Sequence, residues 1–188
     1  MTSMLLSPVA YRYRAAASAF CALIEQRGAE LPATWLGRVH ALLPEVYAAA
    51  LALPDGEPDT TDVHPSRTTY EEWKRLYDEI GSTLGRWNYY WDVFDPYSNS
   101  DHEAVCGSLA DDLAEIYRDL REGQLAEDED GQARPNDVIW CWRFAFVSHW
   151  AAHASGALRA LATAFFVHYA DQLPESFGPQ ASSDPLAS

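Results

Sequence analysis

Apolar residues recur at helical spacing along almost the whole chain, and almost no segment shows the sustained alternation of apolar and polar residues that is typical of strands. The first helical segment begins at Ser7-Pro8, where a capping residue precedes a proline at the first helical position, and it ends at Gly28. The next runs from about residue 32 to 53, and Pro44 is expected to kink or split it because proline lacks the backbone donor. The pattern predicts helices joined by loops.

Three further helices are expected after a loop at residues 54–67. Thr69 and Glu72 form a capping-box pattern that opens a helix to about residue 84. Another runs from about Ser108 to Glu122, and a long final helix runs from about residue 136 to 172. The apolar face expected for this final helix consists of Val147, Trp150, Ala154, Leu158, Leu161 and Phe165. The aromatic segment 87–94 fits a helical turn or a short extended segment, and we expect its rings mostly in the core.

The predicted fold is therefore all-α, a single-domain bundle of five to seven helices with a long C-terminal helix. The 188 residues are long for one hydrophobic core and short for two, so one domain over residues 1–173 is expected. Residues 174–188 are rich in Pro, Ser and Ala, and this composition predicts a disordered tail.

Charge and cysteine content restrict the class of function. The chain has 28 acidic and 13 basic residues, a formal net charge of −15, which repels nucleic acid and acidic membrane surfaces. The N-terminus has no basic region and no signal-like apolar stretch, and no apolar run approaches the roughly 18 residues of a membrane span. Cys21, Cys106 and Cys141 lack paired spacing, which indicates reduced, buried thiols and a cytoplasmic location.

Acidic residues gather on the helix expected at 108–122. Its apolar stripe is Leu109, Leu113, Ile116 and Leu120. Asp112 and Asp119 flank that stripe, whereas Asp111, Glu115 and Glu122 are expected further round towards solvent. Like charges four residues apart, such as Asp111 and Glu115, destabilise an isolated helix by a few tenths of a kcal/mol. A cationic group or a metal ion should therefore lie nearby.

The final helix supplies candidate partners for these acids. His149 and His153 are four residues apart and share one side of the helix, and Arg143 and Arg159 lie on the same helix. We expect the two helices to pack side by side, with an acid within hydrogen-bonding reach of one of these four residues. The residues between the histidines are Trp150, Ala151 and Ala152, so the zinc-protease motif His-Glu-x-x-His is excluded.

Two interpretations of this cluster stay open. The first is structural: salt bridges and two hydrogen-bonded histidines at a helix contact. The second is a ligand site in which a divalent metal ion is bound. The candidate ligand-binding residues are Asp111, Asp112, Glu115, Asp119, His149, His153, Arg143 and Arg159. The candidate metal ligands among them are Asp112, Asp119, His149 and His153.

The favoured function is a cytosolic binding or regulatory helical domain, because no phosphate loop, nucleophile elbow or dinucleotide fingerprint is present. The alternative is a metal-dependent hydrolase or small-ligand site built on the two helices. A protein partner, a small molecule and homo-oligomerisation all stay open. A divalent metal ion is the one cofactor that the sequence suggests.

The chain resembles a bacterial family known as domain of unknown function 5063. The resemblance is carried by Phe94-Asp95-Pro96, by the block from Ser108 to Leu120, by Trp142-x-Phe144, and by His149-Trp150-x-x-His153 followed by Ala157-Leu158-Arg159-Ala160-Leu161. It covers most of the chain and implies a helical bundle of about this length. It implies no activity.

A weaker similarity involves the all-α nucleoside triphosphate pyrophosphatases. Glu71-Glu72 and Asp112-Leu113-Ala114-Glu115 are similar to the paired acidic motifs of that family. In that family the two motifs lie closer along the chain, and Arg75 stands here where its first motif has a third acid. The resemblance implies a metal-dependent nucleotide hydrolase.

Overall fold

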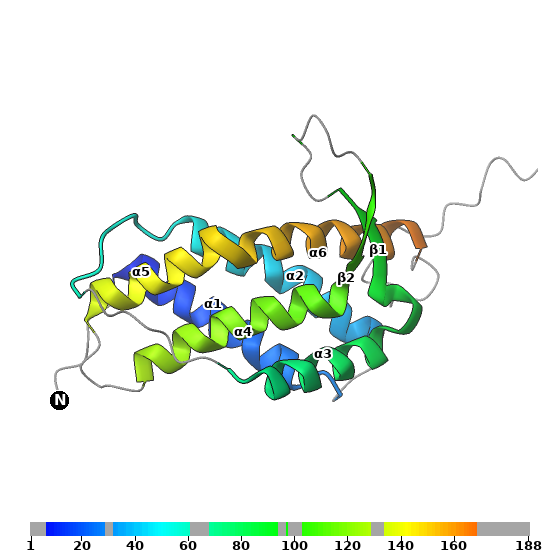
Figure 1. Ribbon diagram of the computed structural model, residues 1–188, viewed down its shortest axis with the longest axis horizontal. Coiled ribbons are helices and arrows are strands. Elements are labelled where there is room, and N and C mark those ends of the chain that lie inside the picture. Colours follow the sequence, from blue (N-terminus) through cyan, green and yellow to red (C-terminus); the bar gives the residue numbers. More distant parts are fainter. Residues whose placement is uncertain are drawn as a thin grey trace, which may run out of the picture.

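The computed structural model describes residues 7–28, 32–60, 68–93, 97, 103–128 and 134–168, and these form a helical bundle that carries one small hairpin (Figure 1). The first four helices are α1 (Pro8–Glu25), α2 (Pro32–Leu51), α3 (Tyr70–Leu84) and α4 (Leu109–Asp128). The C-terminal helix is continuous from α5 (Pro135–Ala145) through a π-helical turn (Phe146–Trp150) and α6 (Ala151–Thr163) to a second π-helical turn (Ala164–His168). The all-α prediction and the long C-terminal helix are confirmed, whereas the expected tail at 174–188 lies outside the described residues.

Local side-chain caps explain where two helices begin. The hydroxyl of Ser7 accepts a hydrogen bond from the Ala10 amide ahead of α1, which satisfies one of the donors that a helix start leaves open. Thr69 and Glu72 form the expected reciprocal capping box at α3. Pro44 is exposed and does not split α2, which continues to Leu51.

Helix α4 lies in the middle of the bundle and packs against α1, α3 and the C-terminal helix (Figure 1). Its expected apolar stripe is buried: Leu109, Leu113, Ile116 and Leu120 are at most 2% exposed. Burying each such side chain stabilises the fold by about 1.5–3 kcal/mol. Any polar residue at the edge of this stripe is therefore drawn towards the interior.

The C-terminal helix presents its buried side chains at an unusual spacing. From Val138 to Ala154, five of the buried side chains recur every four residues, with Cys141 buried beside them: Val138, Trp142, Phe146, Trp150 and Ala154. An α-helix has about 3.6 residues per turn, so this spacing would drift round a regular helix. The wider π-helical turn at Phe146–Trp150 absorbs the drift.

This register corrects two expectations for the apolar face. Val147 is 63% exposed, because Phe146 takes the inward position. Leu158 is only half-buried and packs at the edge of the core, whereas Ala157 and Leu161 are fully buried. Strict α-helical spacing counted back from Trp150 selects Val147, because it takes no account of the extra residue in the π-helical turn.

A hairpin of β1 (Tyr89–Asp92) and β2 (Val105–Ser108) stands at one end of α4 and projects from the bundle (Figure 1). The strands are antiparallel, with Tyr90 opposite Gly107. The core placement expected for the rings of residues 87–94 is wrong for Tyr89 and Trp91, which are 62% and 71% exposed. Tyr90 packs against the core, and Phe94 lies outside the described residues. Cys106 is also exposed, since it lies on this projecting hairpin, whereas Cys21 and Cys141 are buried as expected.

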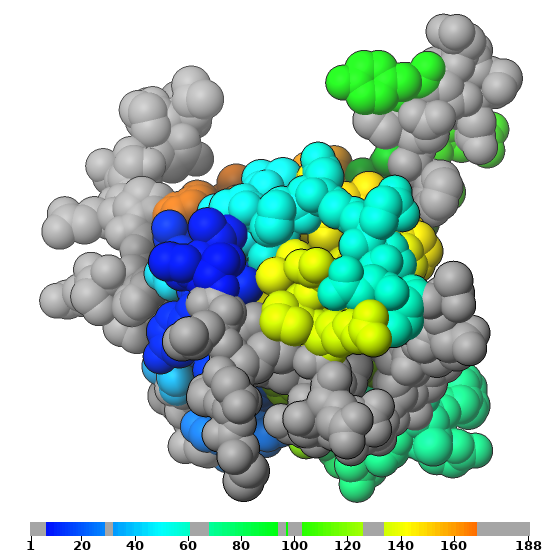
Figure 2. All heavy atoms as spheres, turned by 90° about the vertical axis from the view of Figure 1, so that its left-hand side faces the viewer, coloured from blue at the N-terminus to red at the C-terminus, as the bar shows by residue number. Residues whose placement is uncertain are grey.

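The segment after α2 fixes the start of α5. The Asp137 carboxylate accepts hydrogen bonds from the amides of Asp59 (2.6 Å) and Thr60 (3.1 Å) and from the Thr60 hydroxyl (3.1 Å). Figure 2 shows the segment that ends at residue 60, in cyan, against the start of α5, in yellow-green. This contact holds the orientation of the C-terminal helix over α4. None of the described helices combines the length and the apolar character needed to cross a membrane.

Candidate functional site

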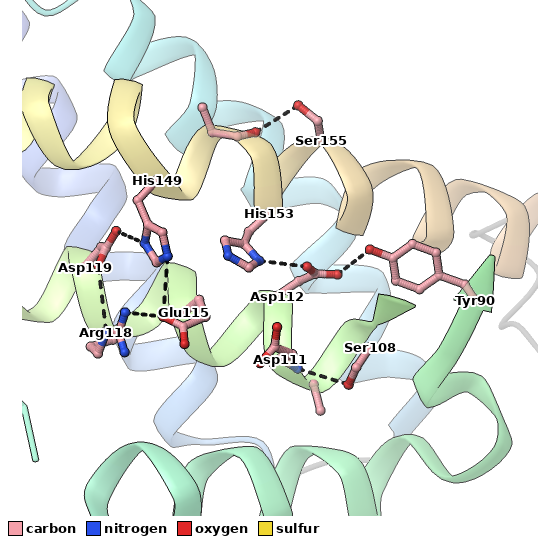
Figure 3. Close-up of polar contacts among 12 residues, drawn as sticks. Tyr90, Ser108, Asp111, Asp112, Glu115, Arg118, Asp119, His149, His153 and Ser155 are labelled. Atoms are coloured by element: carbon pink, nitrogen blue, oxygen red, sulfur yellow. Dashed lines mark hydrogen bonds and ion pairs between the residues drawn. The ribbon is translucent and has the colours of Figure 1, made fainter. Parts of the chain in front are cut away.

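Helix α4 and the C-terminal helix lie side by side, and the acids of one face the histidines of the other (Figure 3). The Nδ1 atom of His149 lies 2.8 Å from Oδ2 of Asp119, and Nδ1 of His153 lies 3.0 Å from Oδ1 of Asp112. The expected contact between the two helices is therefore present. It is made by the histidines.

Asp112 is the most buried acid of the cluster, at 6% exposure. Its two oxygens are both engaged, because the Tyr90 hydroxyl donates to Oδ2 at 2.6 Å while His153 lies at Oδ1. A buried carboxylate without such partners would be costly. Burial, followed by the hydrogen bond to Asp112, raises the pKa of Tyr90, so its hydroxyl stays protonated and donates.

The two hydrogen bonds determine which histidine nitrogen stays available. An ionised carboxylate only accepts, so Nδ1 of each ring carries the proton that it donates. In the neutral ring, Nε2 then keeps its lone pair for a proton or a metal ion. The hydrogen bond to Asp112 raises the pKa of His153, although burial opposes this shift.

Both histidine rings lie on the same side of the C-terminal helix, next to the π-helical turn. His149 belongs to the turn and His153 follows it by one helical turn, and their ring centroids are 4.9 Å apart. Such turns occur often at functional sites, because the inserted residue turns a side chain away from its α-helical position. Sequence periodicity alone did not indicate this turn.

Asp111, Glu115 and Glu122 are half-buried rather than solvent-facing, which corrects the expectation for all three. Burial raises the pKa of all three carboxyl groups. Glu115 forms an ion pair with Arg118, and its Oε2 lies 3.9 Å from Nε2 of His149. Arg118 therefore offsets part of the negative charge, with its Nε 3.9 Å from Asp119.

One group of side chains within the described residues meets the geometry of a metal site. Asp111, Asp112 and His153 each offer one ligand atom, and these atoms lie within 4.8 Å of one another. Nitrogen and carboxylate ligands bind zinc at about 2.0–2.2 Å, which places two ligand atoms at most about 4.4 Å apart. The ligand atoms of Asp111, Asp112 and His153 would therefore have to move closer together to share a zinc ion.

The two candidate arginines lie outside this group. Arg143 points to the segment after α2, where its Nε lies 3.0 Å from the Asp55 carboxylate. Arg159 holds the hairpin, with Asp92 at 2.5 Å and the Trp91 carbonyl at 2.9 Å. Arg159 thus fixes the hairpin that carries Tyr90.

Tyr90 is the site residue that sequence reasoning missed. Its ring fills the space left by two glycines, since an added Cβ would lie 2.7 Å from the ring at Gly107 and 2.6 Å from the hydroxyl at Gly156. Gly156 is a weak point for helix stability, and its conformational cost is offset by this close approach. In the sequence, Gly156 beside the cluster was the one sign that a bulky side chain packs there.

A pocket of about 670 Å³ opens next to Glu115 and His149, between the start of α3, the middle of α4, and α5. We call it the aromatic pocket, because Tyr70, Trp73, Trp140 and Phe144 form much of its wall. Its volume lies in the range of small-molecule sites, roughly 300–1,000 Å³.

The pyrophosphatase resemblance gains no geometric support. Glu71 and Glu72 are exposed on the first turn of α3, and the Glu72 carboxylate accepts the Thr69 amide at 2.8 Å as part of the cap. The Glu72 carboxylate therefore caps the start of α3.

The fold and the acid–histidine cluster together define a class: a helical bundle with a polar site between its central and C-terminal helices. The chain belongs to the family described as domain of unknown function (DUF5063), whose model matches residues 5–166. Its structure is similar to the crystal structure of protein BF1032 from Bacteroides fragilis, a structural-genomics target, with a TM-score of 0.72 and 21% identity over 84% of this chain and 92% of that chain. This likeness shows the fold alone. No curated protein matches the chain.

Proposed function

We propose that this domain binds a divalent metal ion between α4 and the C-terminal helix. The observation that carries the proposal is the convergence of Asp111, Asp112 and His153, whose ligand atoms lie within 4.8 Å of one another. Their mixed nitrogen and oxygen chemistry favours zinc, manganese or iron over calcium or magnesium, which prefer oxygen ligands alone.

Glu115 and His149 extend the candidate ligand set. They lie one turn along their helices from Asp111 and His153, and Nε2 of His149 is 3.9 Å from Glu115. Metal-bound histidines usually donate their other N–H to a carboxylate that orients the ring. Asp119 makes this contact with His149, so its role in the proposal is orientation, whereas Asp112 serves either as ligand or as orienting group.

A metal-dependent hydrolase is the candidate activity for such a site. A bound ion lowers the pKa of a coordinated water to about 7, which makes it a nucleophile at neutral pH. The aromatic pocket borders Glu115 and His149 and provides space for a small substrate beside them. A metal-free binding or regulatory role is the alternative, and a protein partner or homo-oligomer belongs to it.

The proposed location is the cytoplasm. The support is that Cys21, Cys106 and Cys141 are all free thiols, which persist in reducing compartments. The acidic chain, at −15, fits a partner other than nucleic acid.

Elemental analysis of protein purified without chelator, followed by equilibrium dialysis against Mn²⁺ and Zn²⁺, tests metal binding. We expect one ion per chain, and at least about tenfold weaker binding in Asp111→Asn and His153→Gln. Asp78→Asn is the matched control, because that carboxylate pairs with Lys74 on the exposed face of α3. Circular dichroism confirms that each variant is folded. Uptake that is unchanged in both site variants would overturn the proposal.

A further inference from the structure

The aromatic pocket contains two stacked pairs of rings on facing elements. Tyr70 and Trp73 of α3 stack with centroids 5.7 Å apart and planes 28° apart. Trp140 and Phe144 of α5 stack at 5.0 Å and 13°. Tyr70 is 67% and Phe144 is 56% exposed, so each pair keeps one ring open to a ligand. Aromatic faces attract cations and flat apolar groups.

The wall that α4 contributes is acidic. Glu115, Asp119 and Glu122 all line the pocket, and Arg118 is the one guanidinium among its described lining residues. Arg118 lies between Glu115 and Asp119 and so offsets part of their charge, but it leaves the wall negative. Burial raises the pKa of Glu122 despite hydrogen bonds from Thr68, so its ionised carboxylate lacks solvation that a neighbouring cation would replace.

The start of α3 also lines the pocket, and a helix start ordinarily attracts anions. Three backbone amides at this helix start are already engaged by side chains. The Thr68 amide bonds to Glu122 at 2.9 Å, the Thr69 amide bonds to Glu72 at 2.8 Å, and the Glu72 amide bonds to Thr69 at 3.2 Å. An anionic ligand would therefore meet carboxylates and find these donors occupied.

We infer that the aromatic pocket binds a small organic cation, an ammonium or guanidinium group on a flat or apolar body. The body lies between the Tyr70–Trp73 and Trp140–Phe144 pairs, and the cationic group faces Glu122 and its neighbours on α4. The pocket shares Glu115 and His149 with the proposed metal site. The inference itself rests on the ring pairs and Glu122, so it stands independently of the metal.

Three probes of one size separate charge from shape. Benzylammonium is cationic, benzyl alcohol is neutral and benzoate is anionic at pH 7, and each is titrated into the full-length protein by calorimetry in the presence of a chelator. We expect benzylammonium to bind at least about tenfold more tightly than benzyl alcohol, because a desolvated cation gains from both the carboxylate and the rings. Benzoate should bind more weakly than either.

Two variants assign the effect to the pocket. Glu122→Gln keeps an acceptor for Thr68 but removes the charge, and it should reduce the preference for benzylammonium to about threefold or less. Trp140→Leu should weaken benzylammonium and benzyl alcohol together, because it removes one ring pair. Glu71→Gln, an exposed acid on the first turn of α3 that does not line the pocket, is the matched control and should change nothing.

The inference is overturned if the three probes bind equally, if benzoate binds best, if none binds at millimolar concentration, or if Glu122→Gln retains the full preference. The result is separable from metal binding. His153→Gln should lose the metal ion but bind benzylammonium as the wild-type chain does. Glu122→Gln should keep the metal ion but lose most of the preference for benzylammonium.

Discussion

Tyr90 shows how one side chain determines the geometry of the acid cluster at the residue scale. Its ring lies against Gly107 on one side and its hydroxyl lies against Gly156 on the other. The hydroxyl donates to Asp112 at 2.6 Å, so the position of the ring determines where the Asp112 carboxylate lies. Because the backbone approaches Tyr90 closely at both glycines, the side chain has little freedom to move aside.

Gly156→Ala should therefore destabilise the protein. The new methyl group would lie 2.6 Å from the Tyr90 hydroxyl. Overpacking costs about 1–3 kcal/mol, which exceeds the gain of up to about 1 kcal/mol in helix propensity. Chemical denaturation measures the difference. The control is Gly28→Ala, where an added Cβ meets nothing within 4 Å. A Gly156→Ala protein more stable than wild type would show that Tyr90 moves freely.

Two neighbouring tyrosines allow the hydrogen bond to Asp112 to be measured separately. Tyr90→Phe removes a donor to a charged, buried acceptor and should cost about 1.5–3 kcal/mol in the free energy of unfolding. Tyr89→Phe removes the same atom from a ring that is 62% exposed and should change stability by less than about 0.5 kcal/mol. Equal effects of the two substitutions would contradict this role for Tyr90.

His40 provides a pH-dependent prediction far from the cluster. Its ring stacks on Phe165 with centroids 5.5 Å apart, and burial lowers its pKa. The unfolded chain therefore binds the proton first as the pH falls below about 6.5, which favours unfolding. Relative to His40→Gln, the wild-type chain should lose stability between about pH 7.5 and 5.5. Urea titrations of both proteins across that window give the comparison, in which the shared histidines cancel. A constant difference would mean that His40 titrates as in the unfolded chain.

At the scale of elements, the C-terminal helix depends on its π-helical turn. Phe146 and Trp150 of the turn and Leu161 beyond it lie in the core, whereas Leu158 lies at its edge. Leu161→Ala should cost about 2–5 kcal/mol, the range for a buried leucine. Leu158→Ala should cost clearly less, because its side chain is only half-buried. A larger loss for Leu158→Ala would mean that the register of the helix is wrong.

These elements show what periodicity reveals and what it does not. The stripe Leu109, Leu113, Ile116 and Leu120 follows a regular helix, so its burial could be predicted. The positions of Asp112 and Asp119 at the edge of this stripe could be predicted for the same reason. The π-helical turn could not, because one inserted residue leaves the local apolar spacing plausible in either register. For the hairpin, the sequence left a short extended segment open at 87–94 but did not predict its partner strand, since strands of four residues are too short to show alternation.

The candidate site is predictable to the same extent. The acids and histidines follow from two helices whose polar edges need partners, and they meet as expected. Arg143 and Arg159 were equally plausible partners, but Asp55 and Asp92 hold them. Those contacts involve residues far along the chain, from the segment after α2 and from the hairpin. Sequence spacing within one helix contains no information on them.

At the scale of the whole molecule, a charge of −15 means that folding gathers repelling groups. Monovalent salt should therefore stabilise the protein, because at 0.1 M it largely screens the repulsion between exposed charges more than about 10 Å apart. A divalent ion at matched ionic strength should add a separate contribution, because it binds the folded state alone. That contribution is about 2.7 kcal/mol at a hundred times the dissociation constant.

Thermal unfolding in NaCl and in MnCl₂ distinguishes the two effects. His153→Gln should retain the response to NaCl and lose the additional response to Mn²⁺, since only the second requires the Asp111–Asp112–His153 group. If manganese and sodium act equally on the wild-type chain at matched ionic strength, the acids are a screened surface and the metal proposal fails.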